Sequence, residues 1–515
     1  MQLPINESDN QKAIMQQIRA MSLSRSVTPL AYVDTYGCQQ NESDSERLRG
    51  MLEEMGYSFT SDEFAADVII INTCAIRENA ENRVFGNVGA LVHTKRAKPS
   101  QLIFFCGCMA PIAEVAEKIR QSYRHVDVMF SPNNLWRFPQ MLQDALGMPG
   151  VVANIEAEES SECFSSATAK RNGEKFSKLQ QSSEIETDAL GFAAATASTA
   201  SLCDVGEGYI VEGFPVHRDR TIKAWLPIMY GCNNFCSYCI VPYVRGRERS
   251  RRSVDILAEA KELVSQGYKD LTLLGQNVNS YGTGLEENIN FAKLISEINE
   301  LDGEFLVRFM TSHPKDASKE LFIAMANSMK AARHIHLPFQ AGNNRILSHM
   351  NRGYTREEYL GKIALARELM PDIVITSDVI VGFPGETEEE FEDTLNLVEK
   401  AQFDAMFTFI YSKRPGTPAA SLSDDVTREA KQVRFDRLIE LQNAISERKH
   451  SAYIGKSLKV LVDEESHDER YPLKARTNGG RLVHLQGDAN ILGSFVYAKV
   501  THSTSWALFG EAVVS

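Results

Sequence analysis

The fold of this 515-residue chain is decided by the stretch at residues 231–239, which reads GCNNFCSYC. It places three thiols, those of Cys232, Cys236 and Cys239, in a C-x3-C-x2-C arrangement. Three thiolates can hold three irons of a 4Fe-4S cubane and leave the fourth iron open to an exchangeable ligand, such as the amino and carboxylate groups of S-adenosylmethionine. A structural zinc site would need a fourth Cys or His close by, and none follows Cys239 closely. The spacing therefore favours a cluster with one open iron over zinc.

An apolar run leads into the cysteines and indicates the surrounding fold. Residues 224–230 read AWLPIMY, which is typical of a buried strand that ends in a glycine turn. Such a strand would deliver the cysteines to the C-terminal mouth of a parallel barrel, where barrel enzymes do their chemistry. Six segments, each followed by a helical pattern, predict the strands of a partial (β/α)6 barrel. They are residues 224–230, 270–275, 306–312, 334–340, 374–382 and 405–411.

Polar residues and glycines at the predicted mouth are candidates for binding the cofactor. The ring of Tyr238 could pack against an adenine, with simple core packing as the alternative. Glycines would let the backbone approach the cofactor, although a glycine turn that only connects strand and helix has the same pattern. The candidate cofactor-binding residues are Tyr238, Gln276, Gln340, Ser377, Asp378, Gly382 and Gly385. His334 and His336 alternate along one predicted strand, and we expect a structural or hydrogen-bonding role for them.

Upstream of the barrel, short apolar strands alternate with helical patterns. Strands are predicted at 31–37, 67–73, 102–107 and 126–131, and helices at 43–55, 79–91 and 112–122. This pattern is typical of a doubly wound α/β domain. The first three strands end in Cys38, in Cys74 and in the pair Cys106 and Cys108. Because ligands of open α/β sheets gather at the carboxyl ends of strands, these cysteines can converge on a second three-thiolate cluster; the alternative is that they are small buried side chains.

Either Cys106 or Cys108 would complete that second site. Strand periodicity cannot choose between them, because residues two apart on a strand share a face. Gly107 favours Cys108, since a turn after the strand would free Cys108 to reach the sheet edge. Cys106 would still be paired in the ladder and would pack as a small apolar residue.

Length and composition limit the class of protein. A chain of 515 residues is too long for one ordinary core, so about two to four domains are expected. No apolar stretch approaches the ~18 residues of a membrane span, and the first 28 residues lack a signal-peptide core. We expect a cytoplasmic protein with no membrane partner. Nine cysteines in such a protein favour metal ligands over disulfides, and the compartment must be reducing.

The net charge of −13 is unevenly placed along the chain. Residues 151–216 carry eleven acidic side chains against four basic ones, in a low-complexity segment typical of a linker or insertion. The remaining chain can still present a basic face. The predicted division is a polar N-terminal extension at 1–28, an N-terminal domain at 29–147, an acidic linker at 148–217, a barrel core at 218–449 and a C-terminal domain at 451–514.

A run of arginines after the cysteine motif is a candidate contact for the RNA backbone, and the C-terminus has the pattern of a small β-barrel that either binds oligonucleotides or has no RNA role. Guanidinium groups grip phosphates in bidentate fashion; a solvated face or an internal ion-pair network is the alternative. The last 65 residues alternate short apolar runs with glycine-rich turns, which predicts a small antiparallel barrel of the oligonucleotide-binding type with a polar loop at 476–481. The candidate RNA-binding residues are Arg245, Arg247, Arg249, Arg251, Arg252, Arg476 and Arg481.

These motifs resemble those of the radical S-adenosylmethionine methylthiotransferases, and most closely the members that act on tRNA. The resemblance runs from about residue 31 onward and includes TYGCQQN at 35–41, NTC at 72–74, GCMA at 107–110 and the signature at 231–252. It implies a 4Fe-4S cluster that binds S-adenosylmethionine, an auxiliary 4Fe-4S cluster and a C-terminal TRAM domain that binds tRNA. The implied ligands are Cys232, Cys236 and Cys239 for the first cluster and Cys38, Cys74 and Cys108 for the auxiliary one. Cys106 is then a bystander.

Two features depart from the family pattern. Residues 160–208 form an insertion, and Cys163 and Cys203 within it match no family ligand. We expect these two to be free thiols, with a pairing or a metal role as the alternative. The stretch AGNN at 341–344 stands where relatives often read Ser-Gly-Ser, and it leaves Gln340 in place.

The resemblance also implies the reaction. The expected substrate is N6-isopentenyladenosine beside the tRNA anticodon, a loop base that a protein can splay out and stack. The first cluster would cleave S-adenosylmethionine to a radical that takes hydrogen from C2 of the adenine, and the auxiliary cluster would deliver the methylthio group. An electron donor and a sulfur donor are required, and a monomer is expected. The alternatives are another tRNA adenosine derivative, an aspartate of a ribosomal protein, or an iron-sulfur RNA-binding regulator without turnover.

Overall fold

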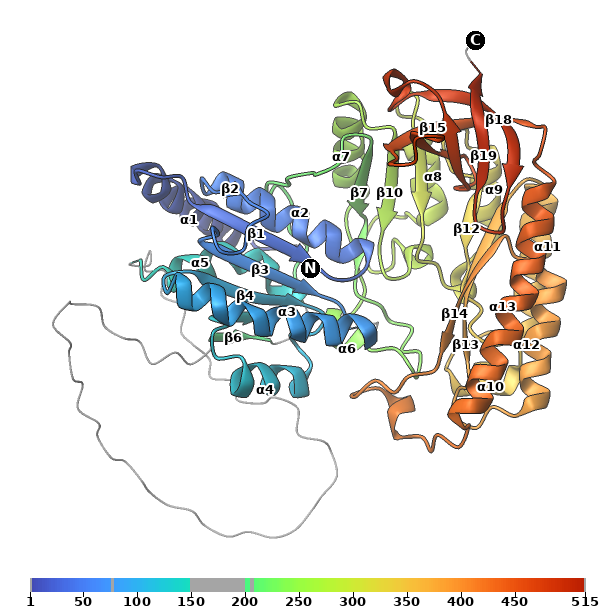
Figure 1. The fold of residues 1–515 in the computed structure, drawn as a ribbon, viewed down its shortest axis with the longest axis horizontal. Helices are drawn as coiled ribbons and strands as arrows, with labels where there is room; N and C mark the ends of the chain where they lie inside the picture. The colour runs from blue at the N-terminus through green and yellow to red at the C-terminus, as the bar shows by residue number, and fades with distance from the viewer. Residues whose placement is uncertain (1, 76–77, 149–199, 204–207, 514–515) are drawn as a thin grey trace, which may run out of the picture.

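The computed structural model describes residues 2–75, 78–148, 200–203 and 208–513. Three units follow one another along the chain: an α/β domain, a central partial barrel and a small closed β-barrel (Figure 1). This is the predicted fold class. Within the described ranges, no helix combines the length and apolar character needed to cross a membrane.

The N-terminal domain is built on a six-stranded sheet in the order β2-β1-β3-β4-β5-β6, with parallel pairing throughout. Its strands are β1 (Leu30–Thr35), β2 (Ser58–Phe59), β3 (Val68–Thr73), β4 (Leu102–Gly107), β5 (Val128–Phe130) and β6 (Ala200–Leu202). Its helices are α1 (Ile5–Ser24), α2 (Gln39–Glu54), α3 (Glu78–Ala97), α4 (Ala113–Ser122) and α5 (Phe138–Ala145). Ile70 of β3 packs on the side of α1, α2 and α5, whereas Ile69 and Ile71 pack on the side of α3 and α4. The doubly wound domain is confirmed.

The polar extension predicted at 1–28 is a helix of this domain. α1 buries Ile14, Met15 and Ile18 in the same apolar cluster as α2 and α5. The apolar stripe that contacts the domain is narrow, and the rest of the helix is polar. Composition alone therefore indicated an extension where the chain forms a docked helix.

The acidic linker predicted at 148–217 contributes to the folded protein at its C-terminal end. β6 pairs with β5, and Cys203, which follows β6, packs against the domain core. Glu212 accepts two hydrogen bonds from Arg251, at 2.7 and 2.6 Å. Cys163 and most of the predicted insertion lie outside the described residues.

Removal of residues 160–198 is expected to leave the thermal unfolding midpoint unchanged, because that deletion spares β6 and Glu212. Removal of residues 160–208 takes β6 away and leaves β5 as the sheet edge, so a lower midpoint is expected. Both midpoints can be followed by circular dichroism. Equal midpoints for the two deletions would show that β6 adds no stability, and insoluble protein after the shorter deletion would show that the segment is structural.

The central unit is a barrel of six parallel strands in two sheets, β11-β10-β7 and β12-β13-β14. Its strands are β7 (Lys223–Pro227), β10 (Asp270–Leu274), β11 (Leu306–Phe309), β12 (His334–His336), β13 (Val374–Val381) and β14 (Ala405–Ile410). A short antiparallel pair, β8 (Met229–Tyr230) and β9 (Arg249–Ser250), flanks the cysteine loop. Its helices are α6 (Val241–Arg245), α7 (Ser253–Ser265), α8 (Phe291–Asn299), α9 (Lys319–Asn327), α10 (Asn344–His349), α11 (Arg356–Leu369), α12 (Glu388–Ala401) and α13 (Arg428–Ser451). All six predicted strands are present, although β12 covers only the first part of the predicted segment 334–340.

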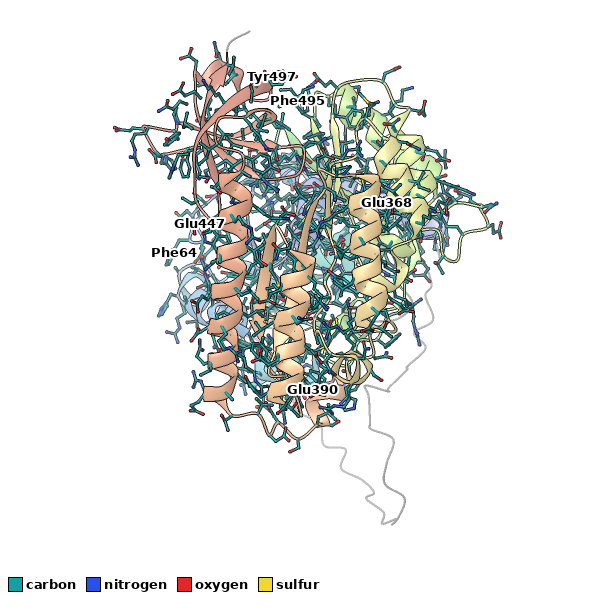
Figure 2. The ribbon with its side chains drawn as sticks, turned by 90° about the vertical axis from the view of Figure 1, so that its right-hand side faces the viewer. Phe64, Glu368, Glu390, Glu447, Phe495 and Tyr497 are labelled. Carbon is teal, nitrogen blue, oxygen red and sulfur yellow. The ribbon has the colours of Figure 1, made fainter. Side chains whose placement is uncertain are left out.

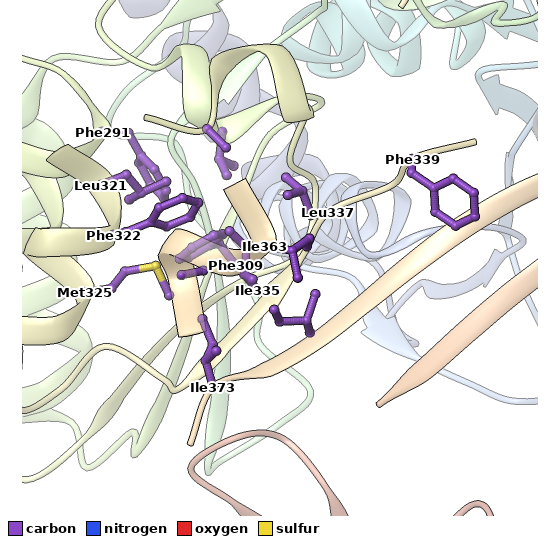
Figure 3. Close-up of a cluster of buried hydrophobic side chains, with 14 of the residues drawn as sticks. Phe291, Phe309, Leu321, Phe322, Met325, Ile335, Leu337, Phe339, Ile363 and Ile373 are labelled. Atoms are coloured by element: carbon purple, nitrogen blue, oxygen red, sulfur yellow. The ribbon is translucent and has the colours of Figure 1, made fainter. Parts of the chain in front are cut away.

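An apolar cluster fills the space between the barrel strands and the outer helices (Figure 3). Phe309 of β11 packs edge-on against Phe291 of α8, with ring centroids 4.9 Å apart. His334 and His336 both hydrogen-bond the Thr376 hydroxyl, at 2.9 Å each. Burial lowers the pKa of His334 to about 3, so its ring is neutral. The hydrogen-bonding role expected for this histidine pair is confirmed.

The C-terminal unit is a small closed barrel, as predicted, with the strand order β15-β16-β17-β19-β18. It is not antiparallel throughout as predicted, because β17 and β19 pair in parallel. Its strands are β15 (Ser457–Glu465), β16 (Leu473–Thr477), β17 (Leu482–Gln486), β18 (Phe495–Ser503) and β19 (Leu508–Val513). Short 3₁₀ helices lie at η1 (Pro132–Arg137), η2 (Val278–Ser280), η3 (Pro314–Asp316), η4 (Pro418–Ser421) and η5 (Ala489–Ile491). α12 lies between α11 and α13 on the outside of the central barrel, and α13 leads into the closed barrel (Figure 2).

The polar loop predicted at 476–481 docks on the central barrel. The Arg308 guanidinium donates to the carbonyls of Asn478 and Thr477, at 2.9 and 3.1 Å. Arg481 is 9% exposed and pairs with Asp404 at 2.5 Å. A phosphate cannot replace that partner without undocking the two units, so the structure contradicts an RNA contact by Arg481.

Candidate metal centres

The three cysteines of the first motif lie in one loop that follows β8. Cys232 and Cys236 are buried, and Cys239 is half-buried. Phe235 has a left-handed φ of 46°, a conformation that costs a non-glycine residue energy. The Asn351 side chain donates to the Phe235 carbonyl at 2.9 Å and supports this turn from outside the loop. Burial, followed by the neighbouring Cys236 thiol, raises the pKa of Cys239 to about 12, so a metal ion must displace a proton to bind there.

Two further side chains face the sulfur of Cys236. Arg352 donates to Cys236 Sγ at 3.2 Å and to the Tyr238 hydroxyl at 3.3 Å. His313 Nε2 lies 3.9 Å from the same sulfur. The Lys315 N–H donates to His313 Nδ1, so the ring proton sits on Nε2, facing the sulfur. Burial lowers the pKa of His313 to about 2, and the ring is neutral.

Four of the predicted cofactor-binding residues lie at the barrel mouth or inside it. Tyr238 lies near Cys236, since Arg352 donates hydrogen bonds both to the Tyr238 hydroxyl and to Cys236 Sγ. Gln276 lines one cavity together with Gly231 and Arg245. Gln340 has a left-handed φ of 67° and pairs with β13 through its backbone. Asp378 lies 3.3 Å from His336 Nε2.

The other three serve the connections between strands and helices. Ser377 is fully buried, and its hydroxyl donates to the Leu337 carbonyl at 2.8 Å and accepts the Phe339 N–H at 3.0 Å. The side chain of Lys431 covers Gly382, since a Cβ there would lie 2.3 Å from Lys431 Cγ. The Gly385 N–H donates to Asp425 at 3.0 Å. The structure does not support cofactor contacts by Ser377, Gly382 or Gly385, because neighbouring protein groups already occupy them.

The second set of cysteines lies at the carboxyl ends of three adjacent strands. Cys38 follows β1 and precedes α2, Cys74 follows β3, and Cys108 follows β4. Gly37 makes the close approach between the first two possible, because a Cβ at Gly37 would lie 2.5 Å from Cys74 Cβ. The Cys74 thiol, hydrogen-bonded to Cys38, lowers the pKa of Cys38 to about 6.

Two asparagines from the quoted motifs join the loops that carry Cys38 and Cys74. Asn41 Nδ2 donates to Asn72 Oδ1 at 3.0 Å and to the Thr73 carbonyl at 2.9 Å. Asn72 Nδ2 returns a bond to the Asn41 carbonyl at 2.9 Å. Asn41 Oδ1 also accepts the Cys38 thiol at 3.3 Å. Both asparagines are buried, so this fully bonded network fixes the relative position of the two thiols.

Cys106 and Cys108 separate onto opposite faces of the sheet. Cys106 packs with the α1, α2 and α5 side, whereas Cys108 packs with the α3 and α4 side. Gly107 between them has a φ of 93°, and a Cβ there would lie 2.3 Å from the Thr73 carbonyl oxygen. This turn ends the regular alternation of side chains along β4, as predicted. The Cys108 N–H donates to the Thr73 carbonyl oxygen, with 2.7 Å between N and O.

Helix α6 connects the two cysteine sites. It begins two residues after Cys239, and Ile240 and Val244 pack into the N-terminal domain in the same apolar cluster as Cys108. Arg245, its last residue, donates to Cys108 Sγ at 3.1 Å and to Asp44 at 2.9 Å. The loop of the first site thereby reaches a thiol of the second.

The arginine run after the motif is mainly an internal network. Arg245 and Arg251 are 5% and 2% exposed, and Arg251 pairs with Glu212 and Glu259 at 2.6 and 2.8 Å. The structure contradicts RNA contacts by Arg245 and Arg251, because both are buried on protein carboxylates. Arg249 is half-buried and donates to Asn133 at 3.1 Å.

Two arginines of the run remain at the surface. Arg247 is exposed, with its guanidinium 4.5 Å from the centroid of the Phe235 ring. Arg252 is exposed and pairs with Asp255 at 2.7 Å. In the C-terminal barrel, Arg476 keeps about a third of its side chain exposed and pairs with Asp463 at 3.2 Å.

Each cysteine set is suited to an iron-sulfur cluster. Cys232, Cys236 and Cys239 share one loop, and Cys38, Cys74 and Cys108 follow three adjacent strands. Each thiolate of a cubane bonds a different iron, so three thiols suit three irons. Among the described residues, no three His, Cys, Asp or Glu side chains converge closely enough to hold one common metal ion. No disulfide joins any of the six cysteines. Two buried residues at these sites, Arg352 and Asp44, were not predicted from the sequence. Neither lies in a recognisable local motif.

Three family models match the chain, in the order of its structural units. The Uncharacterized protein family UPF0004 matches residues 30–131, the Radical SAM superfamily residues 226–398 and the TRAM domain residues 451–513. The Radical SAM match implies a 4Fe-4S cluster and S-adenosylmethionine, and Cys232, Cys236 and Cys239 lie within it.

Relatives match over nearly the full length. The chain is 44% identical over 507 residues to the tRNA-2-methylthio-N(6)-dimethylallyladenosine synthase of Thermoanaerobacter sp. (strain X514), covering 98% of this chain and 97% of the relative. It is 42% identical over 511 residues to the synthase of the same name from Acetivibrio thermocellus, covering 98% and 96%. Among solved structures, the radical S-adenosylmethionine methyltransferase TsrM from Kitasatospora setae matches with a TM-score of 0.51 at 14% identity, over 76% of this chain and 74% of that chain, a likeness of fold alone. The chain belongs to the family of the tRNA-2-methylthio-N(6)-dimethylallyladenosine synthases.

Proposed function

We propose that the protein adds a methylthio group to C2 of N6-dimethylallyladenosine, also called N6-isopentenyladenosine, beside the anticodon of tRNA. The names of its relatives and its TRAM domain support this substrate. The single observation that carries the proposal is the meeting of two three-cysteine sites through α6 and Arg245. Replacing an unactivated C–H bond by a C–S bond needs both hydrogen abstraction and a sulfur carrier, and two separate sites suit two such tasks.

The chain's own residues divide these tasks. Cys232, Cys236 and Cys239 would hold the cluster of the first site, and Cys38, Cys74 and Cys108 a second 4Fe-4S cluster that carries the sulfur. When bound, the first cluster with S-adenosylmethionine would supply hydrogen-atom abstraction from carbon, which acid–base side chains cannot perform. Tyr238 and Gln276 would contact that cofactor, and Gln340 and Asp378 would line the barrel. An electron donor and a sulfur donor are required as partners, and we expect a cytoplasmic monomer.

The exposed arginines remain candidates for the RNA backbone. Arg247→Gln is expected to raise KM for tRNA while kcat stays close to wild type, because it removes a phosphate contact outside the reacting centre. The slope of log affinity against log salt should fall by about 0.7–0.9, as for one lost phosphate contact. Filter binding across a salt series measures that slope.

Arg251→Gln is the matched control. It leaves the half-buried Glu212 without its cation and Glu259 paired with Arg218 alone, which is expected to destabilise the fold by about 1–3 kcal/mol with no change in the salt slope of the folded protein. A normal salt slope for Arg247→Gln would remove that arginine from the RNA interface.

The proposed function is tested by nucleoside analysis of tRNA from cells with and without the gene. We expect 2-methylthio-N6-dimethylallyladenosine to disappear and N6-dimethylallyladenosine to accumulate in the deletion strain. Loss of a different methylthio nucleoside would point to another adenosine derivative, and an unchanged tRNA profile with a changed ribosomal protein would point to an aspartate substrate. Formation of 5′-deoxyadenosine by the reduced protein would reject a regulator without turnover.

A further inference from the structure

Each cysteine site contains one buried arginine that donates a hydrogen bond to a cysteine sulfur. At the first site, Arg352 is 4% exposed and lies 3.2 Å from Cys236 Sγ. At the second site, Arg245 is 5% exposed and lies 3.1 Å from Cys108 Sγ. Hydrogen bonds to the sulfurs and net charge both tune the reduction potential of an iron-sulfur cluster. The two arginines are therefore placed to act on two clusters.

The remaining partners of Arg352 are neutral. Its guanidinium donates to the Pro338 carbonyl at 2.7 Å, to the Tyr354 hydroxyl at 3.2 Å and to the Tyr238 hydroxyl at 3.3 Å. Within the part of the chain that the structure describes, no carboxylate forms an ion pair with Arg352. Its positive charge is thus opposed only by the cysteine thiolates when a cluster is bound.

Arg245 has a carboxylate partner. It donates to Asp44 Oδ2 at 2.9 Å, and both side chains are buried. Asp44 lies in the first turns of α2, shortly after Cys38. The three thiolates of this site therefore face an arginine whose charge Asp44 already offsets, and the site carries one more negative charge among its direct contacts than the first site.

We infer that Arg352 and the Arg245–Asp44 pair give the two clusters unequal electrostatic surroundings, with Arg352 easing reduction of the cluster on Cys232, Cys236 and Cys239. The inference rests on the proposed function for the second cluster. A buried cation stabilises the added electron, whereas a cation already paired with a carboxylate does so less. The arrangement directs the electron toward the site that the Radical SAM match assigns to S-adenosylmethionine. Arg352 and Arg245 act through the cysteines and are positioning residues.

Other charges near the first site do not cancel that of Arg352. Glu248 faces Cys232 and adds to the rise in the pKa of that thiol to about 11, which is mainly due to burial. Glu248 is itself only half-buried and interacts with Lys315. Lys315 and Lys362 contribute further positive charge on the side of His313.

The test measures each cluster in isolation. One background carries Cys38→Ala, Cys74→Ala and Cys108→Ala, and the other carries Cys232→Ala, Cys236→Ala and Cys239→Ala. Each full-length protein is reconstituted anaerobically, and its reduction potential is measured by redox titration followed by electron paramagnetic resonance. This readout needs neither tRNA nor turnover.

In the first background, Arg352→Gln is expected to make reduction at least tenfold less favourable, which is ~59 mV for a one-electron couple. Arg352→Lys keeps the charge and should recover most of the loss. Arg308→Gln, which removes a buried arginine paired with Asp270 away from both sites, should leave the potential unchanged. A shift of less than threefold in Arg352→Gln, or an equal shift in Arg352→Lys, would overturn the inference.

In the second background, Asp44→Asn preserves the shape of the side chain and should make reduction easier, because it frees the charge of Arg245. This arm stands even if Arg352→Gln fails to fold, and an unchanged or lower potential would refute the charge argument. Failure here would leave the tRNA nucleoside result untouched, so it is distinguishable from failure of the proposed function. If the second background binds no iron, there is no second cluster for Arg245 to act on, and the inference is overturned.

Discussion

Cys236→Ala is expected to abolish both 5′-deoxyadenosine formation and the methylthio product. The substitution removes one of three thiolates and leaves Arg352 buried beside a methyl group, with no sulfur to accept its hydrogen bond. Anaerobically reconstituted wild-type protein should carry about eight irons, because each three-cysteine site suits one 4Fe-4S cubane. Cys236→Ala should carry about four. Iron assay and chromatography of the reaction mixture give both results.

Cys203→Ala provides the control for that loss. Cys203 follows β6 and belongs to neither three-cysteine set, so its replacement should leave about eight irons and both products. About four irons in the wild type, with all six site cysteines intact, would contradict the two-cluster model. Retention of 5′-deoxyadenosine formation in Cys236→Ala would remove the first site from the reaction.

The strands could be predicted from sequence because they are apolar and end at turns. β3 reads VIIINT and is buried along its whole length, so its pattern leaves no alternative. β12 is the counterexample, since it covers only His334–His336 where 334–340 was predicted. Pro338 lacks an N–H, and Gln340 has a left-handed φ, so the second half of that segment leaves the strand geometry.

The roles of the arginines could not be predicted because they depend on distant partners. Five arginines in eight residues have the pattern of a phosphate-binding loop, yet Arg245 pairs with Asp44, 201 positions away. Arg251 likewise finds Glu212, at the end of a segment that its composition marked as a linker. Arg352 belongs to no charge run at all. The role of a buried arginine cannot be predicted from its local sequence, because the carboxylate or sulfur that accepts its hydrogen bond comes from another element.

Cys108→Ala is expected to remove the auxiliary cluster and all methylthio product while 5′-deoxyadenosine formation survives. Cys106→Ala is expected to cost little in either assay. Both residues flank Gly107, but only Cys108 lies on the face of α3 and α6 and accepts a hydrogen bond from Arg245. Cys106 packs on the opposite face, and burial raises the pKa of its thiol far above the usual value, as for a small apolar side chain.

The two variants must be compared by measuring 5′-deoxyadenosine and the methylthio product separately, because a loss of stability is expected from both variants. Either substitution removes a buried sulfur, so a small loss of stability is expected from both. If Cys108 is a cluster ligand, Cys108→Ala alone should also bind only about four irons, form 5′-deoxyadenosine as before and form no methylthio product. If Cys106→Ala gave that pattern instead, the third ligand would be Cys106, on the opposite face of the sheet. The assignment of Cys108 as the ligand, which rests on Gly107 and Arg245, would then be wrong.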